Sequence, residues 1–271
     1  MQGKIIIAVA MALLLSACGE NATMEEKTSE TAKQFVARIQ AEGALLEEES
    51  SAAQWVRNTY ITPDTAILAR KAGERSLAFQ SSMVKQAKQF RDADMDTETA
   101  RAIELILRGS SAPAPNDAAL RTELSAILTN MEGQYGSGQY CNTAGVCREL
   151  QELESVLAQS RDYDELLDVW QGWRQVSPPY RKEYQRFVEI GNQGAKDFGY
   201  SNLADLWQGG YDMESEVFVE ESRRLWGEVK PFYDELHCYV RGRLSETYGA
   251  EKVPNEGPIP AHLLGNMWSQ T

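Results

Sequence analysis

Residues suited to metal or acid–base chemistry are scarce in this sequence, and their spacing forms no catalytic motif. Only two histidines occur, His237 and His262, and neither belongs to an HExxH pair, which would supply two zinc ligands and a glutamate base from one helical turn. No G-x-S-x-G motif and no glycine loop ending in Gly-Lys-Ser/Thr is present either. We therefore expect both histidines to be structural and the sequence by itself to hold no complete active site.

Two groups of aromatic residues are the strongest candidates for binding. Trp170, Trp173 and Arg174 follow one another closely in the segment WQGWR, and Trp207 and Tyr211 form a second group in LWQGGYDM. A guanidinium among indole N–H donors suits a partly buried anion. The alternative is that these aromatics are core residues and that Arg174 pairs with a carboxylate. Composition alone favours this alternative, and both interpretations stay open at this stage.

Four cysteines indicate both the compartment and the cross-links. Cys141 and Cys147 bracket the segment NTAGV, in which Asn142 and Gly145 favour a tight turn. In an oxidising compartment this pair is a plausible disulfide, whereas a metal site would need a second ligand pair, and none lies nearby. Cys238 is in an apolar helical run, and we expect it to be a buried free thiol.

The first thirty residues resemble an export signal followed by a tether. Lys4 precedes the apolar run IIIAVAMALLL, which is shorter than the roughly 20 residues that span a bilayer. The next segment, LSACG, resembles a bacterial lipobox, in which Cys18 becomes the lipidated first residue; the alternative is an ordinary signal peptide with a chance cysteine. We predict a signal peptide over 1–17, a tether over 18–30, and a lipid anchor in a membrane of the cell envelope, facing the periplasm.

The charge balance excludes some functions. The 271 residues include 27 basic and 40 acidic ones, a net charge of −13. Such an excess of negative charge argues against binding to nucleic acid or to an anionic membrane surface. The length allows one large domain or two smaller ones.

Helical periodicity dominates the rest of the sequence, so we predict an all-α fold. Asn116 or Asp117 offers an N-cap, Gly249 suits a C-cap, and Pro231 predicts a kink or two abutting helices. No segment alternates like a strand between hairpin turns. The apolar stripes lie within 79–90, 120–131, 150–157, 180–191 and 225–244.

The last fifteen residues, GPIPAHLLGNMWSQT, predict the start of a helix. Pro258 and Pro260 end the preceding element, and Leu263, Leu264 and Met267 have the spacing of a helix face. No stop signal closes this helix, and nothing follows it to pack against. We therefore expect the sequence to be the N-terminal part of a larger fold.

This terminal segment and four earlier ones, in the same order and at similar intervals, resemble the angiotensin-converting-enzyme family of zinc dipeptidyl carboxypeptidases, the M2 peptidases. The resemblance runs from about Trp55 to Thr271. The five segments are CNTAGVC, SRDYDELLDVWQGWR, LADLWQGGYDM, HCYVRGRLSETYGAEKV and GPIPAHLLGNMWSQT.

The resemblance implies a fold and an activity. Family members are large helical zincin-type peptidases with a deep central channel and a buried zinc ion. They release dipeptides from peptides that have a free C-terminus, and chloride activates many of them. Residues 31–271 would be the incomplete N-terminal portion of such a domain, from a bacterial homologue.

The resemblance also implies roles for individual residues. Cys141 and Cys147 match a family disulfide, Arg174 a chloride ligand, and Tyr211 a tyrosine beside a second chloride. Gln270 matches a glutamine whose amide N–H binds the carboxylate of the substrate. The HExxH helix and the other zinc and carboxylate ligands lie downstream in the family, so no catalytic residue and no metal ligand is assigned here.

Two functional hypotheses follow. The first is an N-terminal fragment of an exported, lipid-anchored zinc peptidyl-dipeptidase, inactive without its zinc-binding half. The alternative is a non-catalytic exported helical lipoprotein, a binding module derived from such a peptidase.

Overall fold

The computed structural model describes residues 30–269, most of which lie in helices, and the all-α prediction is confirmed. The described residues from Ala32 onward form one compact unit. The predicted signal peptide and nearly all of the tether lie outside the described residues. The helices are α1 (Ala32–Thr59), α2 (Pro63–Ala87), α3 (Thr97–Arg108), α4 (Ala118–Gly136), α5 (Leu150–Gln159), α6 (Tyr163–Trp173), α7 (Arg181–Phe198), α8 (Leu203–Gly209) and α9 (Ser215–Tyr248), with 3₁₀ turns η1 (Lys88–Phe90), η2 (Pro178–Tyr180) and η3 (Ala261–Leu263).

Short polar side chains fix where several helices begin. Asp117, rather than Asn116, is the N-cap of α4, and its carboxylate accepts hydrogen bonds from the backbone N–H groups of Ala119 at 2.7 Å and Leu120 at 3.2 Å. Thr62 caps α2 through a reciprocal capping box. The predicted N-cap region of α4 is therefore confirmed.

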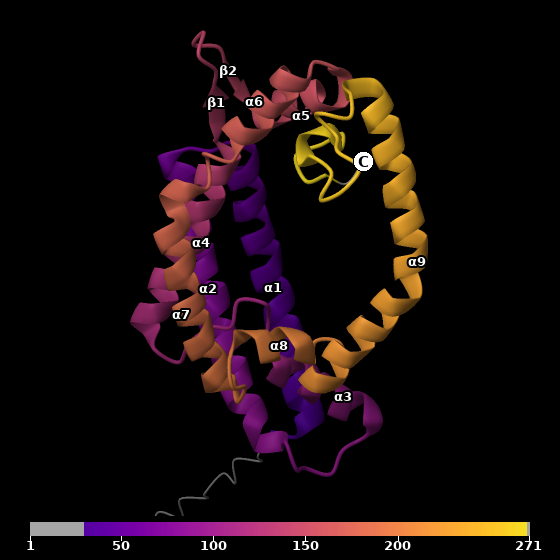
Figure 1. Ribbon diagram of the computed structural model, residues 1–271. Helices are drawn as coiled ribbons and strands as arrows, with labels where there is room; N and C mark the ends of the chain where they lie inside the picture. Colours follow the sequence, from indigo (N-terminus) through magenta and orange to yellow (C-terminus); the bar gives the residue numbers. More distant parts are fainter. Residues whose placement is uncertain (1–29, 270–271) are drawn as a thin grey trace, which may run out of the picture. The chain divides into compact units, whose positions relative to one another are not determined.

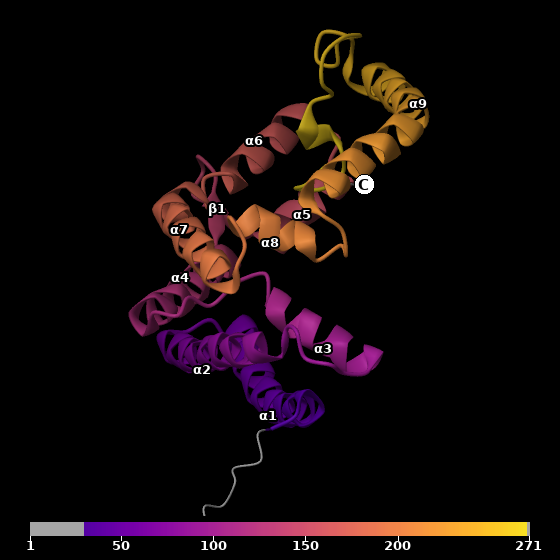
Figure 2. The ribbon, with the colours of Figure 1, turned by 90° about the horizontal axis from the view of Figure 1, so that it is seen from below.

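Four long helices pack in sequence against one another. Helix α1 lies against α2, α2 against α4, and α4 against α7, while α3 contacts both α1 and α2 (Figures 1 and 2). Phe35 of α1 and Ile103 of α3 are buried in one cluster. Leu124 of α4 and Ile190 of α7 are buried in another, so apolar side chains hold these helices together.

A small hairpin interrupts the helices. Strands β1 (Gln139–Cys141) and β2 (Cys147–Glu149) pair antiparallel, and a disulfide joins Cys141 to Cys147, as predicted. The side chain of Asn142 accepts hydrogen bonds from the backbone of Ala144 and Val146, which closes the turn. These strands were not predicted from the sequence, because three residues are too few to show an alternating pattern.

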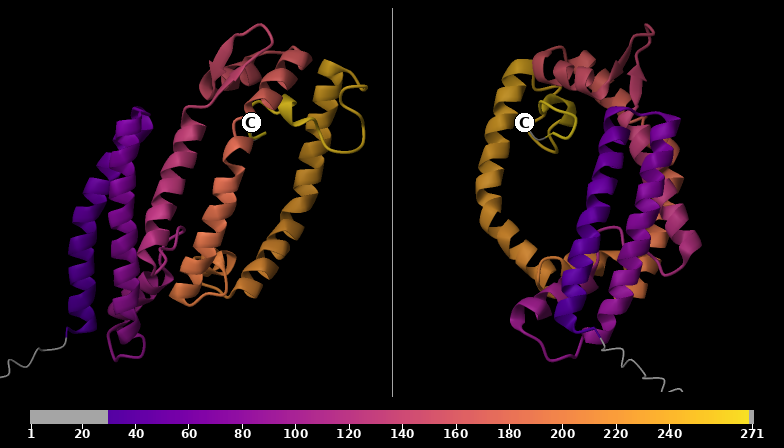
Figure 3. Two further views of the ribbon diagram at one scale, coloured as in Figure 1. Left: turned by 90° about the vertical axis from the view of Figure 1, so that its left-hand side faces the viewer. Right: turned by 180° about the vertical axis from the view of Figure 1, so that it is seen from behind.

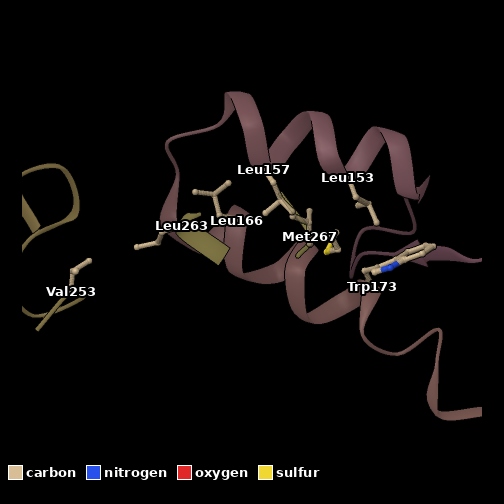
Figure 4. Close-up of a cluster of buried hydrophobic side chains, with 8 residues drawn as sticks. Leu153, Leu157, Leu166, Trp173, Val253, Leu263 and Met267 are labelled. Carbon is tan, nitrogen blue, oxygen red and sulfur yellow. The ribbon is translucent and has the colours of Figure 1, made fainter. Parts of the chain in front are cut away.

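The segment after α9 folds back onto α5 and α6. Met267 is fully buried and Leu263 nearly so, and both pack into a cluster with Leu153 of α5 and Leu166 of α6 (Figure 4). The prediction that a helix begins in this segment is wrong. Only η3 forms, and turns with positive φ follow at Gly265 and Ser269. The expectation that this segment has no packing partner is also wrong. It packs against α5 and α6, which precede it in the chain.

Helix α9 is held at its two ends. It packs against α8 near its beginning, and Leu244 and Tyr248 near its end contact the α5–α6 cluster (Figure 3). None of its side chains is buried by the part of the chain that the structure describes. Cys238 is therefore exposed, and its predicted burial is wrong. Pro231 lies inside one continuous helix, which curves along its length (Figure 1) and is not split in two.

Replacing Met267 tests whether the terminal segment stabilises the fold. We predict that Met267→Ala lowers the free energy of unfolding by about 2–5 kcal/mol, because it leaves a cavity among buried side chains. The neighbouring Trp268 is 49% exposed, and Trp268→Ala should cost only about 1 kcal/mol. Urea denaturation of both variants measures the difference. Equal losses would show that the segment does not pack as described.

Candidate functional site

Arg174 lies at the end of α6, where this helix meets the terminal segment. It is the C-cap residue of this helix, and its guanidinium lies over the Trp170 ring, 4.4 Å from the centroid. It also donates a hydrogen bond to the carbonyl oxygen of Met267. No carboxylate pairs with Arg174 among residues 30–269. The alternative that Arg174 serves a structural ion pair therefore finds no support there.

The two tryptophans beside Arg174 differ in their surroundings. Trp173 is buried and packs edge-on against Tyr135 at 5.4 Å, so it is a core residue. The Nε1 of Trp170 is buried, yet it has no hydrogen-bond partner in the described part of the chain. Burial lowers the pKa of Arg174, because desolvation disfavours its charged form. A guanidinium and an unused indole N–H, both partly desolvated, suit an anion.

Tyr211 lies between α8 and α9. Its ring is 62% exposed and lies 4.3 Å from that of Phe218. It lines a hollow of about 380 Å³ together with Trp207 and Arg108. The indole N–H of Trp207 is already used, since it donates to the carbonyl oxygen of Ser111 at 2.8 Å. The group of Trp207 and Tyr211 thus offers fewer free hydrogen-bond donors than the group around Arg174.

The cations beside Tyr211 are already neutralised. Asp212, which has a positive φ of 60°, accepts two hydrogen bonds from Arg101 at 2.9 and 2.8 Å and also pairs with Arg108. Hydrogen bonds from Arg101 and then Arg108 hold the pKa of Asp212 below its usual range. Glu104 pairs with both arginines. This network could not be predicted from local sequence patterns, because Asp212 follows Arg101 by 111 residues.

The structure does not bring the two candidate anion ligands together. Arg174 belongs to α6, whereas Tyr211 follows α8, and Figure 1 shows α6 and α8 near opposite ends of α9. Two separate anion sites, as the family resemblance implied, are compatible with this arrangement. Gln270 lies outside the described residues. Ser269, directly before it, donates a hydrogen bond from its hydroxyl to the carbonyl oxygen of Ala261.

The histidines do not form a metal centre. His262 is buried, 4.6 Å from the ring of Tyr163, while His237 lies on α9 beside Tyr233. Within residues 30–269, no group of three His, Cys, Asp or Glu side chains could hold a metal ion. The residues present therefore do not fit a zinc site.

No helix in the described range is both long enough and apolar enough to cross a membrane. Cys18, the predicted lipidation site, lies outside that range.

Known proteins match this chain over most of its length. The family model of peptidase M2, described as angiotensin-converting enzyme, matches residues 26–271. Angiotensin-converting enzyme from Bos taurus is 34% identical over 243 residues, which are 88% of this chain and 18% of the relative. The angiotensin-converting enzyme-like protein Ace3 of Mus musculus is 33% identical over 261 residues, 95% of the chain and 35% of the relative.

A relative of lower identity also matches most of the chain. Angiotensin-converting enzyme from Theromyzon tessulatum is 31% identical over 264 residues, or 93% of this chain and 41% of the relative. The chain therefore spans less than half the length of each of these three relatives.

The buried histidine predicts how stability depends on pH. Burial lowers the pKa of His262, so the folded chain binds this proton less readily than the unfolded chain does. The free energy of unfolding should therefore decrease as the pH falls below about 6.5, the ordinary pKa of histidine. We predict that the free energy of unfolding falls less in His262→Leu than in the wild type when the pH is lowered from about 7.5 to about 5.5.

Urea denaturation at several pH values measures the effect. His237→Leu is the matched control, because it removes the other histidine from a helix on which no described side chain is buried. If the wild type and His262→Leu lost stability in parallel, burial of His262 would not be the cause.

Proposed function

Because the chain belongs to the angiotensin-converting enzyme family, peptidase M2, we propose that it forms part of a zinc metallopeptidase that releases C-terminal dipeptides from peptides. The family match over residues 26–271 carries this proposal. The activity belongs to a longer protein, comparable in length to the relatives, in which additional polypeptide supplies the zinc ligands. In this proposal residues 1–271 bind zinc poorly and are inactive alone.

The surface of α9 supports the proposal. Leu225, Val229, Phe232 and Leu236 recur at helical spacing, and they are between 47% and 70% exposed. A continuous apolar surface of this kind usually marks an interaction site. In our proposal the additional polypeptide of the longer protein packs on this face. A non-catalytic binding module would use the same face for a partner, so zinc binding by the longer protein separates the two hypotheses.

The candidate binding residues then have defined roles. Arg174, with the indole N–H of Trp170, binds one chloride ion, and Tyr211 lies beside a second one. The ion pairs of Arg101 and Arg108 with Asp212 mean that the second site needs further ligands from the additional polypeptide. Gln270 donates a hydrogen bond to the C-terminal carboxylate of the peptide substrate.

The location of the enzyme is also a proposal. The segment LSACG supports lipidation at Cys18 and export to the cell envelope, where the disulfide would be stable. The intact mass of the mature protein tests this: it should include acyl chains on Cys18, and an unmodified mass would contradict it.

Comparing the 271-residue chain with the longer protein tests the function. We predict that the longer protein binds zinc stoichiometrically and cleaves a blocked tripeptide with a free C-terminus, because only it holds a complete ligand set. Amidation of the same tripeptide removes the carboxylate that Gln270 binds and should weaken cleavage. Zinc binding and cleavage by residues 1–271 alone would contradict the proposal, as would an inactive longer protein.

A chloride titration tests the role of Arg174. In the longer protein, Arg174→Ala should raise the chloride concentration for half-maximal activation about tenfold or more, because a charge-assisted contact is lost. Arg161→Ala is the matched control, since Arg161 donates only to nearby backbone carbonyl oxygens. An unchanged chloride response in Arg174→Ala would remove this residue from the site.

A further inference from the structure

Tyr140 of β1 contacts α6 at two positions that lie one turn apart. Its hydroxyl donates a hydrogen bond to the Oδ1 of Asp168 at 2.6 Å. Its ring lies directly on Gly172, where a Cβ would overlap the ring carbons, so only glycine lets the ring and the helix come so close. Residues four apart in a helix are neighbours on its surface. Tyr140 therefore covers one face of the end of α6.

The hydrogen bond to Asp168 keeps the Tyr140 hydroxyl protonated. The bonded carboxylate raises the pKa of Tyr140, because it disfavours loss of the phenolic proton. The hydroxyl is therefore a donor throughout the neutral pH range. A hydrogen bond to a charged acceptor is also stronger than one between neutral groups. The contact between β1 and α6 thus combines packing with a charge-assisted bond.

Trp170 and Arg174 lie on the opposite side of the same helix. Each of them follows a residue that Tyr140 contacts by two positions, and two positions correspond to about 200° around an α-helix. Arg174 still has a right-handed helical backbone conformation. On this side its guanidinium lies over the Trp170 ring and donates to the carbonyl oxygen of Met267. The end of α6 is therefore held between Tyr140 and the terminal segment.

The disulfide fixes the strand that carries Tyr140. Cys141 follows Tyr140 directly and is bonded to Cys147 of β2. Tyr140 itself lies opposite Arg148 in the register of the hairpin, which lies beside α6 (Figure 1). A hairpin of two short strands is marginally stable by itself. The cross-link therefore helps to keep β1, and with it Tyr140, in place.

We propose that Tyr140 is a positioning residue for Arg174: the disulfide-linked hairpin holds Tyr140 against α6, and this contact keeps the guanidinium over Trp170 and beside Met267. Tyr140 itself touches neither anion nor substrate. The functional consequence, tighter chloride binding, rests on the function proposed above for Arg174. The position of the guanidinium can be measured without assuming that function.

NMR of the 271-residue chain, prepared with isotope-labelled arginine, measures this position. The ring current of Trp170 should shift the δ protons of Arg174 upfield, because the guanidinium lies over the ring. Arg174→Lys identifies the signal by its loss. We predict that Tyr140→Ala removes most of the upfield shift. Tyr140→Phe keeps the ring on Gly172 and loses only the bond to Asp168, so it should change the shift less and in the same direction.

Tyr184→Ala is the matched control, since Tyr184 lies on α7, is 53% exposed and has its ring near that of Phe187. A loss of stability alone would lower the folded fraction without moving the Arg174 signal of the folded molecules. An unchanged signal in both Tyr140 variants would overturn the proposal, as would an equal change in Tyr184→Ala. If Tyr140→Ala does not fold, the signal of Tyr140→Phe decides between the same two outcomes.

Reduction of the disulfide tests whether the hairpin acts through Tyr140. Breaking the bond between Cys141 and Cys147 should move the Arg174 signal in the wild type. It should add little in Tyr140→Ala, because both changes remove the same contact and are therefore not additive. Equal effects of reduction in the two proteins would overturn the proposal.

The chloride response of the longer protein measures the functional consequence. Tyr140→Ala should raise the chloride concentration for half-maximal activation about threefold or more and leave the rate at saturating chloride unchanged, because Arg174 is displaced but still present. A lower rate at saturating chloride with an unchanged chloride response would overturn the positioning role. If the longer protein did not respond to chloride at all, the function proposed for Arg174 would fail, whereas the NMR signal would still decide on Tyr140.

Discussion

Met267 makes the packing contact on which the rest of the structure depends. Its fully buried side chain holds the last segment against α5 and α6, and its carbonyl oxygen accepts a hydrogen bond from Arg174. Since this segment follows α9, the same contact fixes the end of that helix. Leu244 and Tyr248 also join the end of α9 to this cluster, and without Met267 Arg174 would lose one of its two neighbours. One apolar contact thus places both a candidate ligand and a long helix.

This arrangement explains how binding and catalysis could be divided within one enzyme. The described residues supply a desolvated arginine and an unused indole N–H, but no set of zinc ligands. They also leave the apolar face of α9 uncovered. In our proposal the additional polypeptide covers this face and supplies the zinc ligands. The two halves then depend on one another for both stability and activity.

Features encoded by local sequence could be predicted. The cap at Asp117, the cysteine pair and the helical stripes each depend on residues that are close in sequence, and the structure confirms them. The pairing of Arg101 with Asp212 could not be predicted, since it depends on how distant helices meet.

The wrong predictions have a common physical cause. Leu263 and Met267 show helical spacing, but their burial against α5 and α6 decides their conformation, so the segment forms turns. Cys238 lies in an apolar run, yet it is exposed, because the described residues do not cover α9. In both cases tertiary packing decided the outcome, and a periodic pattern does not show what lies opposite it.

Hydrogen exchange in α9 tests the central claim most directly, because amide protection reports how well a helix is held by its surroundings. In the 271-residue chain, the amides of residues 225–239 should exchange faster than those of Leu124 and Ile127 in α4, which packs on both α2 and α7. In the longer protein the same α9 amides should become strongly protected. Equal protection of α9 in the two proteins would contradict the account.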